Sequence, residues 1–278
     1  MTQSTAIITG GGGGMGLACA RLLSKDYRIL LVEIDPDRLE RALTLLAEAG
    51  TSASGRVADI SDHEQTLSLA EWAREEGTLG ALIHTAGLSP TMASGDRIWK
   101  VNLVGSANLL HALSPQVGPD CVAILIASQA AHFLGDTPSP ELQAILEEPL
   151  AADLIERIEK LSPDWLEPGI AYAAAKLGVL RLAVRTALEW GPRGARVVSL
   201  SPGMIETGMG KQEYAAQPFM KTMLEKTPLQ RMGKEDEIAQ AVKFLCSSAA
   251  SFITATDLLV DGGSTAAVRH MVAGPRSE

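Results

Sequence analysis

Tyr172 and Lys176 stand four positions apart in the segment YAAAK, and this pair is well suited to acid–base chemistry. Residues at this spacing share one face of a helix. A free tyrosine has a pKa of about 10, but a neighbouring ammonium favours the phenolate and lowers that pKa. The spacing therefore predicts a tyrosine that exchanges a proton with an alcohol near neutral pH. The same spacing also occurs on the surfaces of alanine-rich helices, so the surrounding sequence has to decide.

Five consecutive glycines near the start of the chain, in TGGGGGMG at residues 9–16, lie between two apolar segments. The segment before them is predicted to be a strand, and the segment after them has apolar residues at helical spacing. Gly10, Gly14 and Gly16 can provide a sharp turn, an approach of backbone N–H groups to a pyrophosphate, and close packing of the helix on the sheet. A merely flexible turn has similar glycines, so the loop alone does not identify a nucleotide site.

The second predicted strand, RILLVEID, ends in two acids about 20 residues after the glycine loop, where dinucleotide-binding folds place an acidic residue. Such an acid accepts hydrogen bonds from the adenosine ribose of NAD and repels the 2′-phosphate of NADP. We assign this role to Glu33, because Asp35 is equally suited to cap the next helix, with Pro36 in its first turn. The glycine loop contains neither Arg nor Lys, which also favours NAD.

The elements that must position these residues follow from seven short apolar segments, at residues 6–9, 28–34, 53–58, 81–85, 122–128, 195–201 and 258–260. They are rich in Val, Ile and Leu, as in strands buried on both faces of a parallel sheet. Their alternation with helical patterns predicts the α/β class, with a single-domain, doubly wound parallel sheet of Rossmann type in the order 3-2-1-4-5-6-7. We expect one domain over residues 1–265, followed by a loose tail over residues 266–278.

The composition excludes several functional classes. An apolar fraction of 46% in 278 residues is enough for a core, and a net charge of −9 argues against nucleic acid or an anionic membrane as partner. The three cysteines and five histidines show no metal-ligand spacing, so we expect no metal site and a reducing compartment. We find neither a signal peptide at the start nor an apolar run of about 18 residues, and therefore expect a cytoplasmic location.

Residues 133–169 interrupt the regular alternation and carry nine acids and two bases. Apolar residues at helical spacing predict two amphipathic helices separated by Pro149, the first beginning at Ser139 and Pro140. This insert is a solvated acidic hairpin, a cap over the active site, or an altered subunit interface.

Together, these motifs resemble the short-chain dehydrogenase/reductase family, and the resemblance extends from about residue 5 to residue 263. Besides the glycine loop and YAAAK, it rests on further segments in the family's order: ADIS (58–61), HTAG (84–87), WKVNLVG (99–105), ILIAS (124–128), SPGMIET (201–207) and the stretch from RMGKEDE to LLVDGG (231–263).

The resemblance implies hydride transfer between a nicotinamide and a carbinol or carbonyl carbon. Tyr172 is then the acid/base, and Lys176 lowers its pKa and binds the cofactor ribose. Ser128 steadies the substrate oxygen, and Asn102 positions the lysine through water. The implied cofactor contacts are Gly10, Gly14, Met15, Gly16, Glu33, Asp59 (at the adenine), Ile60, Ala86, Gly87, Tyr172, Lys176, Pro202, Gly203 and Thr207 (at the nicotinamide carboxamide).

Two departures from the family pattern stand out. HTAG replaces the usual NNAG, and we interpret His84 and Thr85 as structural residues of that loop. The insert separates Ser128 from Tyr172 by many more residues than is common in the family. Its position resembles the 3α-hydroxysteroid dehydrogenase/carbonyl reductase branch.

The substrate and partner expectations are broader. Methionines after SPG, together with Phe219, suggest either a lid for a flat, hydrophobic, steroid-like alcohol or ordinary core packing. His132 is a further candidate for the pocket. Because the family pairs through the helix with the Tyr and Lys, we expect a homodimer or homotetramer. The alternative functions are a non-catalytic NAD-sensing or scaffold protein and an enoyl reductase, whose Tyr and Lys are spaced further apart.

Overall fold

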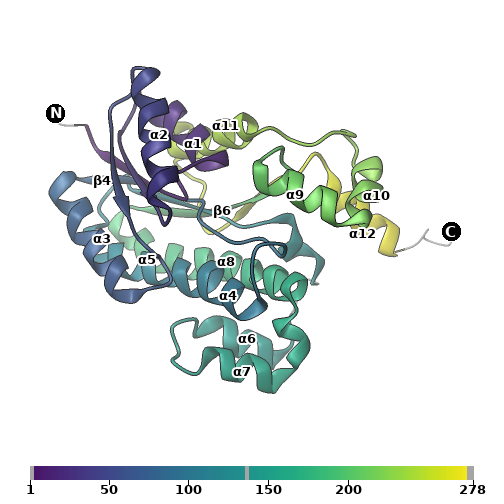
Figure 1. Cartoon of the computed structure of the whole chain (residues 1–278). Helices are drawn as coiled ribbons and strands as arrows, with labels where there is room; N and C mark the ends of the chain where they lie inside the picture. Colours follow the sequence, from purple (N-terminus) through teal and green to yellow (C-terminus); the bar gives the residue numbers. More distant parts are fainter. Residues whose placement is uncertain (1–2, 135–137, 274–278) are drawn as a thin grey trace.

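The computed structural model describes residues 3–134 and 138–273. Its centre is a parallel sheet in the order β3-β2-β1-β4-β5-β6-β7 (Figure 1), which confirms the predicted fold class and strand order. The strands are β1 (Thr5–Thr9), β2 (Arg28–Glu33), β3 (Ala53–Val57), β4 (Leu79–His84), β5 (Val122–Ile126), β6 (Arg196–Pro202) and β7 (Asp257–Val260). Their ends lie within two residues of the predicted ranges.

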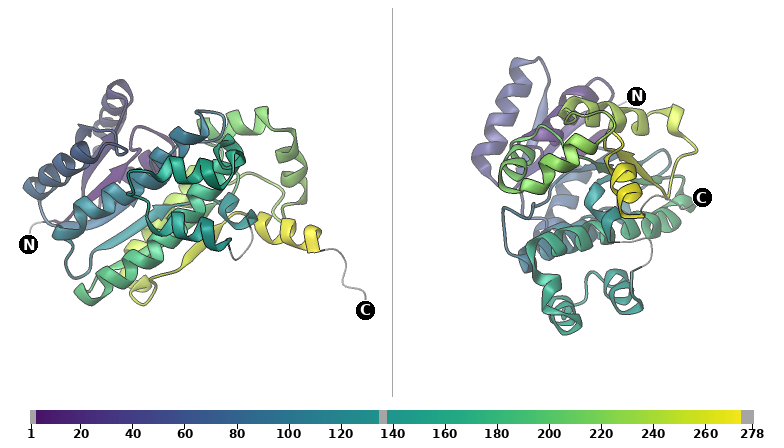
Figure 2. Two further views of the ribbon diagram at one scale, coloured as in Figure 1. Left: turned by 90° about the horizontal axis from the view of Figure 1, so that it is seen from below. Right: turned by 90° about the vertical axis from the view of Figure 1, so that its right-hand side faces the viewer.

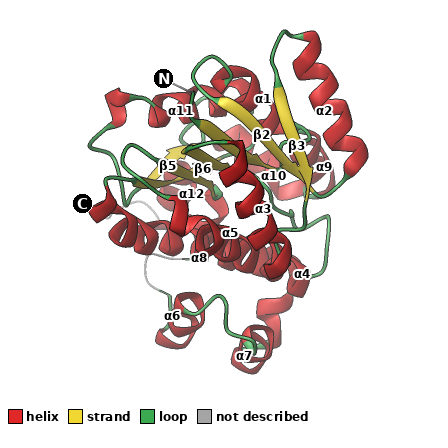
Figure 3. Ribbon diagram, turned by 90° about the vertical axis from the view of Figure 1, so that its left-hand side faces the viewer, coloured by secondary structure: helices red, strands yellow, loops and turns green. Residues whose placement is uncertain are grey.

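Helices cover both faces of this sheet (Figures 1 and 3). One layer contains α1 (Gly14–Leu23), α2 (Pro36–Glu48) and α11 (Glu235–Cys246), and the other contains α3 (His63–Glu76), α5 (Gly105–Leu113) and α8 (Pro168–Trp190). Side chains of a strand alternate between faces: Ile7 packs in one core, and Ala6 and Ile8 pack in the other. Both faces are buried, which explains why the strands are apolar throughout.

A short helix and a π-helical turn connect the sheet to α5. Helix α4 (Gly95–Trp99) runs into the turn Lys100–Val104, which contains Asn102. Trp99 is fully buried, and its indole Nε1 donates a hydrogen bond to the carbonyl of Trp165 at 2.9 Å. This contact anchors α4 to the segment that leads into α8.

The insert forms the two predicted helices, α6 (Pro140–Glu147) and α7 (Leu154–Leu161), and the Ser139 hydroxyl caps the first. Residues 135–137 lie outside the described residues. Buried Leu142, Ile145 and Ile158 pack with Trp99 and the buried alanines of α8. In Figures 1 and 2 both helices lie against α4 and α8, away from α9 (Gly208–Ala216) and α10 (Pro218–Lys226). The two insert helices therefore pack on the side of α4 and α8.

The expected loose tail needs a similar correction, because Ser264–Ala273 form helix α12. The Asp261 carboxylate accepts hydrogen bonds from the backbone of Gly263 and Thr265 at the start of this helix. Val268 then packs on the methionines of α10. Residues 274–278 lie outside the described residues. Among the helices of the described ranges, none combines the length and apolar character needed to cross a membrane.

Candidate active site

The glycine loop joins β1 to α1 and shapes one end of a cleft. Gly10 and Gly14 have φ angles of +67° and +53°, in the left-handed region that favours glycine. No side chain caps the start of α1, and its first turn has no acidic residue. The first N–H groups of a helix lack partners within the helix and attract anions. The loop is therefore shaped to hold a phosphate group.

This cleft has a volume of about 620 Å³ and lies at the carboxyl ends of β1, β2 and β4. Most of the predicted cofactor residues line it: Gly10, Gly14, Met15, Glu33, Asp59, Ile60, Ala86, Gly87 and Thr207. A pyrophosphate at the glycine loop with an adenosine beside Glu33 and Asp59 suits this arrangement, so the residues present fit a dinucleotide.

Five predicted cofactor residues are not among those lining the cleft: Gly16, Pro202, Gly203, Tyr172 and Lys176. Gly16 lies under the glycine loop, where a Cβ atom would clash with the carbonyl of Gly10, so it allows α1 to pack closely. Pro202 ends β6, and Gly203 packs against the backbone of Asp261. Gly16 and Gly203 are thus positions where the packing leaves no space for a side chain.

Glu33 ends β2, and its carboxylate is almost completely buried. It accepts hydrogen bonds from the backbone of Gly12 at 3.1 Å and of Ile34 at 3.0 Å, so it braces the glycine loop as well as lining the cleft. Asp35 accepts from the backbone of residues 37 and 38 and caps α2, as its alternative assignment predicted. The two acids thus have separate positions: Glu33 faces the cleft and Asp35 faces the helix.

Arginines at the adenosine end of the cleft were missed from the sequence. Arg38 lies 3.8 Å from the Glu33 carboxylate, and Arg41 lines the same wall. Arg97 pairs with Asp59 at 2.8 Å. Burial alone would raise the pKa of Asp59, but hydrogen bonds from Ser61 and Arg97 outweigh it and hold that pKa below its usual value. The only sequence signal for Arg38 and Arg41 was their place in the first turns after β2.

Ser128, Tyr172 and Lys176 come together from two elements. Ser128 follows β5, Tyr172 and Lys176 project from α8, and the Ser128 hydroxyl hydrogen-bonds with the Tyr172 phenol. The Lys176 ammonium lies 6.0 Å from the centre of the Tyr172 ring and donates to the carbonyl of Ile126 at 2.7 Å. A Cβ atom at Gly87 would contact both Lys176 Nζ and Asn102 Oδ1. The group therefore borders the cleft.

The electrostatics of this group differ from the expectation. Burial raises the pKa of Tyr172 to about 12, and the hydrogen bond with Ser128 offsets only part of that rise. Burial also lowers the pKa of Lys176 to about 8. The predicted lowering of the tyrosine pKa by Lys176 is thus not present among the protein's own groups, because loss of water around both side chains dominates.

Asn102 and His84 support the site from behind. The Asn102 side chain pairs with both backbone groups of Leu88, accepting at 2.8 Å and donating at 2.9 Å. His84 is buried and hydrogen-bonds to Thr9 and Ser106. Asn102 and His84 therefore hold the loop after β4 in place.

Most of the remaining candidates are not among the residues that line the cleft. His132 pairs with Asp257 at 2.9 Å and is not among the residues that line the cleft. Met204, Met220 and Met223 are buried against one another, whereas Phe219 is exposed. Met209, another of the methionines after SPG, does line the cleft.

Comparison with known proteins places these features in a family. The family model described as "short chain dehydrogenase" matches residues 4–137, and the model described as "Enoyl-(Acyl carrier protein) reductase" matches residues 165–265. A short-chain dehydrogenase/reductase of Alternaria brassicicola is 31% identical over 96% of this chain and 97% of its own length. The galactitol 2-dehydrogenase (L-tagatose-forming) of Cereibacter sphaeroides is 29% identical, covering 94% of each chain.

A solved structure agrees with this placement. A short-chain dehydrogenase/reductase from Brucella melitensis, described as glucose/ribitol dehydrogenase, superposes with a TM-score of 0.74 at 26% identity, over 95% of this chain and 97% of that one. With the fold, the cleft and the relatives all in agreement, the chain belongs to the short-chain dehydrogenase/reductase family, whose members are oxidoreductases of alcohols and ketones that use NAD(P).

Proposed function

We propose that this protein transfers a hydride between NAD(H) and a secondary alcohol or ketone. The observation that carries the proposal is the meeting of Ser128, Tyr172 and Lys176 at the edge of the dinucleotide cleft. The nicotinamide, when bound, supplies the hydride or accepts it. The residues described above bind and orient the cofactor and the substrate, and they transfer the proton.

In the reduction direction, the neutral Tyr172 phenol donates its proton to the carbonyl oxygen of the substrate. Ser128, within hydrogen-bonding reach of the phenol, donates to the same oxygen and holds it in place as negative charge develops. The Lys176 ammonium stabilises the phenolate that remains. Oxidation of an alcohol follows the same path in reverse.

We further propose NAD as the preferred cofactor. The buried Glu33 carboxylate lines the adenosine end of the cleft, where it can accept hydrogen bonds from ribose hydroxyls. A 2′-phosphate there would bring its negative charge against this carboxylate. Arg38 and Arg41 act in the opposite direction, but Arg38 lies beside Glu33, which offsets its charge.

The test is a spectrophotometric assay of NADH formation with a panel of secondary alcohols, run with the parent and with Tyr172→Phe. We expect turnover with NAD that Tyr172→Phe lowers by about 10²–10⁴-fold, the usual contribution of a positioned acid/base. Tight NADH binding without turnover of any alcohol would instead favour the non-catalytic sensor or scaffold. Unchanged turnover in the variant would contradict the role of Tyr172.

The position of the insert supports the 3α-hydroxysteroid dehydrogenase/carbonyl reductase branch as a finer proposal. The hydrophobic substrate that this branch suggests has less support, because the buried lid methionines pack among themselves. The enoyl reductase alternative finds no support in the spacing of Tyr172 and Lys176, which lie one turn apart on α8.

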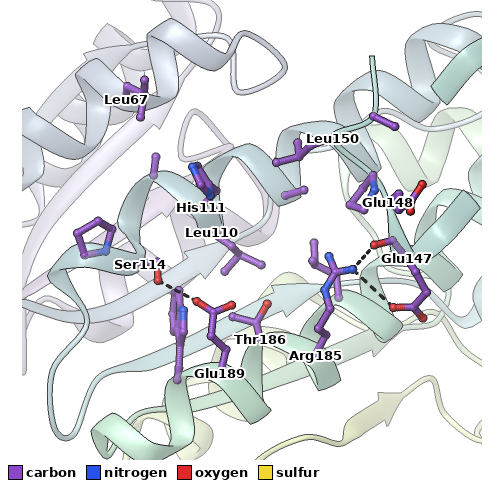
Figure 4. A pocket seen from close by; sticks show the side chains of 17 residues that line it. Leu67, Leu110, His111, Ser114, Glu147, Glu148, Leu150, Arg185, Thr186 and Glu189 are labelled. Carbon is purple, nitrogen blue, oxygen red and sulfur yellow. Dashed lines mark hydrogen bonds and ion pairs between the residues drawn. The ribbon is translucent and has the colours of Figure 1, made fainter. Parts of the chain in front are cut away.

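We also propose a cytoplasmic homo-oligomer that assembles through the outer face of α8. A groove of about 780 Å³ runs there between α5, α8 and the turn after α6 (Figure 4). Leu150 lines it, and Leu188 on α8 is 71% exposed. The insert covers part of this face of α8, because Arg181 and Arg185 of α8 pair with Glu147 at the end of α6.

Light scattering after size-exclusion chromatography tests this assembly. We expect Leu188→Asp to lower the molecular mass from that of a dimer or tetramer, with the thermal stability of the subunit core retained. Deletion of residues 136–166 should change the assembly if the insert governs the interface. An unchanged mass in both variants would contradict the proposal.

A further inference from the structure

Helix α4 lies between the dinucleotide cleft and the insert, and Arg97 is on its cleft side. Arg97 lines the cleft together with Asp59 and Ile60, at the end where the adenosine of a dinucleotide fits. Its guanidinium donates one hydrogen bond to the Ser61 hydroxyl at 2.9 Å and another to the Asp59 carboxylate at 2.8 Å. The side chain is nevertheless 40% exposed. The guanidinium is therefore held through two of its nitrogens and still has surface open to the cleft.

The positive charge of Arg97 is already balanced by Asp59. The second carboxylate oxygen of Asp59 accepts hydrogen bonds from the backbone and the hydroxyl of Ser61, at 2.9 and 2.7 Å, so the acid is fixed as well. Because this carboxylate offsets the cation, a phosphate group would meet both charges there. A guanidinium is flat and weakly hydrated, and it stacks on aromatic rings. A flat, paired guanidinium therefore suits an uncharged aromatic base better than a phosphate.

The opposite side of α4 packs against the insert. The indole Nε1 of Trp99 donates to the backbone carbonyl of Trp165 at 2.9 Å. Gly95 lies so close to the backbone of Leu166 that an added Cβ atom would overlap its carbonyl group. Ile98 and Trp99 are fully buried in a core cluster whose members from α6 and α7 are Leu142, Ile145, Leu146, Leu154 and Ile158. The insert therefore supplies part of the core on which α4 rests.

A helix as short as α4 needs this support. It spans only the five residues Gly95–Trp99. Helices of this length are not stable by themselves in water, so the position of α4 depends on its tertiary contacts. Contacts with the insert on one side of α4 thus determine where the guanidinium on the other side lies.

We propose that Arg97 binds the adenine base of the cofactor with the flat face of its guanidinium, and that the insert strengthens this binding by fixing α4. The inference rests on the proposed use of NAD. It assigns Arg97 as a binding residue and Trp99 as a positioning residue that acts through Arg97. The insert then increases affinity for the adenosine half of the cofactor without touching the cofactor itself.

Two fragments of the cofactor test the role of Arg97. ADP-ribose contains the adenosine but no nicotinamide, and NMNH, the reduced nicotinamide mononucleotide, contains the nicotinamide but no adenosine. We expect Arg97→Gln to weaken the binding of ADP-ribose, measured by calorimetry, at least fivefold and to leave NMNH binding, measured by fluorescence, unchanged. Arg97→Lys should restore little of the ADP-ribose binding, because an ammonium can pair with Asp59 but has no flat face.

Lys100→Gln is the matched control for the loss of charge. Lys100 directly follows α4, is exposed, pairs with Asp96 and is not among the residues that line the cleft. Its replacement should leave the binding of both fragments unchanged.

Trp99→Phe tests the contribution of the insert, because it removes the indole donor to Trp165 and keeps an aromatic ring in the core. We expect it to weaken ADP-ribose binding about threefold, and to have no further effect in a protein that already carries Arg97→Gln. Deletion of residues 136–166 should give a selective loss that approaches that of Arg97→Gln. Trp72→Phe is the control, because its indole donates to Glu76 within α3 at 3.1 Å.

Each outcome bears on one part of the proposal. Unchanged ADP-ribose binding in Arg97→Gln, or equal losses for both fragments, would overturn the role of Arg97, and full binding by Arg97→Lys would overturn the contact through its flat face. No effect of Trp99→Phe, or the same effect with and without Arg97, would overturn the role of the insert. Thermal melts identify variants that fail to fold, and Trp99→Phe keeps this part testable if the deletion does not fold. Binding of the fragments needs no turnover, so failure to oxidise any alcohol would contradict the proposed function alone.

Discussion

The Nε2 atom of His84 lies 2.8 Å from the Ser106 hydroxyl, which donates its own proton to the backbone carbonyl of Asn102 at 2.7 Å. The Ser106 oxygen therefore accepts from Nε2 of His84, and because burial keeps the ring neutral, Nδ1 accepts from the Thr9 hydroxyl 2.7 Å away. The imidazole is thus neutral and fully hydrogen-bonded. It links the end of β1, just before the glycine loop, to the π-helical turn that carries Asn102.

Because His84 is neutral and buried, acid should destabilise the protein. Burial, with the nearby Lys176, lowers the pKa of His84 from 6.5 to about 3. Between these values the unfolded chain binds a proton that the folded protein does not, so stability is complete above pH 6.5 and is lost as pH falls. We expect His84 to contribute a loss of about 2 kcal/mol between pH 7 and pH 5.

Urea unfolding at pH 7 and pH 5 measures this loss. His84→Asn should weaken the fold at pH 7 but show a smaller further loss at pH 5 than the parent. His270→Asn is the control, because His270 is exposed on α12. A parent protein equally stable at both pH values would contradict the buried neutral state of His84.

Lys176 should set the alkaline limit of the reductive reaction. Tyr172, with a pKa of about 12, keeps the proton that it donates, whereas Lys176, with a pKa of about 8, loses its charge in the alkaline range. We expect kcat/KM for carbonyl reduction to be constant below pH 8 and to fall above it. In Lys176→Arg the fall should move to higher pH, because a guanidinium stays protonated. An alkaline limb that is identical in both proteins would show that another group titrates.

The sheet could be predicted from the sequence because each strand is a short apolar run. Strands that are buried on both faces have this continuous apolar pattern. The same is true of the insert, where Ser139 caps a helix whose apolar residues recur at helical spacing. Helix α12 could not be predicted in this way. Its start is fixed by Asp261 and its packing by methionines some 50 residues earlier in the chain, so its stability depends on tertiary contacts.

The candidate site, too, could be predicted from the sequence only in part. Tyr172, Lys176 and Glu33 could be named because their spacing relative to the strands and helices is local information. The sign of the Tyr172 pKa shift could not be predicted, because it depends on how much water the folded chain excludes.

Glu33 should control the choice between NAD and NADP. Glu33→Ser removes the carboxylate that faces the adenosine end of the cleft and leaves Arg38 and Arg41 there without the acid that offsets them. Because arginine binds phosphate groups well, we expect the ratio of kcat/KM for NADP to that for NAD to rise at least tenfold. The measurement is steady-state kinetics with each cofactor at saturating alcohol.

Asp35→Ala provides the control for this change at the next acid along the chain. Asp35 caps α2 through the backbone of residues 37 and 38. Its removal should cost about 1 kcal/mol of stability without altering the cofactor ratio. If both variants changed the ratio equally, or if Glu33→Ser left it unchanged, Glu33 would not be the selecting residue.

Gly16 should limit cofactor binding through packing alone. A Cβ atom at Gly16 would collide with the carbonyl of Gly10 and lie 2.8 Å from the Thr85 hydroxyl, so Gly16→Ala must push α1 away from the glycine loop. We expect NADH binding, followed by fluorescence, to weaken at least tenfold. Gly169→Ala, near the start of α8, has no heavy atom within 4 Å of the added Cβ and should bind NADH normally, with stability equal to or above that of the parent. Since both changes add one methyl group at the start of a helix, a difference between them isolates the contact with the loop, and equal binding by the two variants would show that α1 can shift without disturbing the phosphate site.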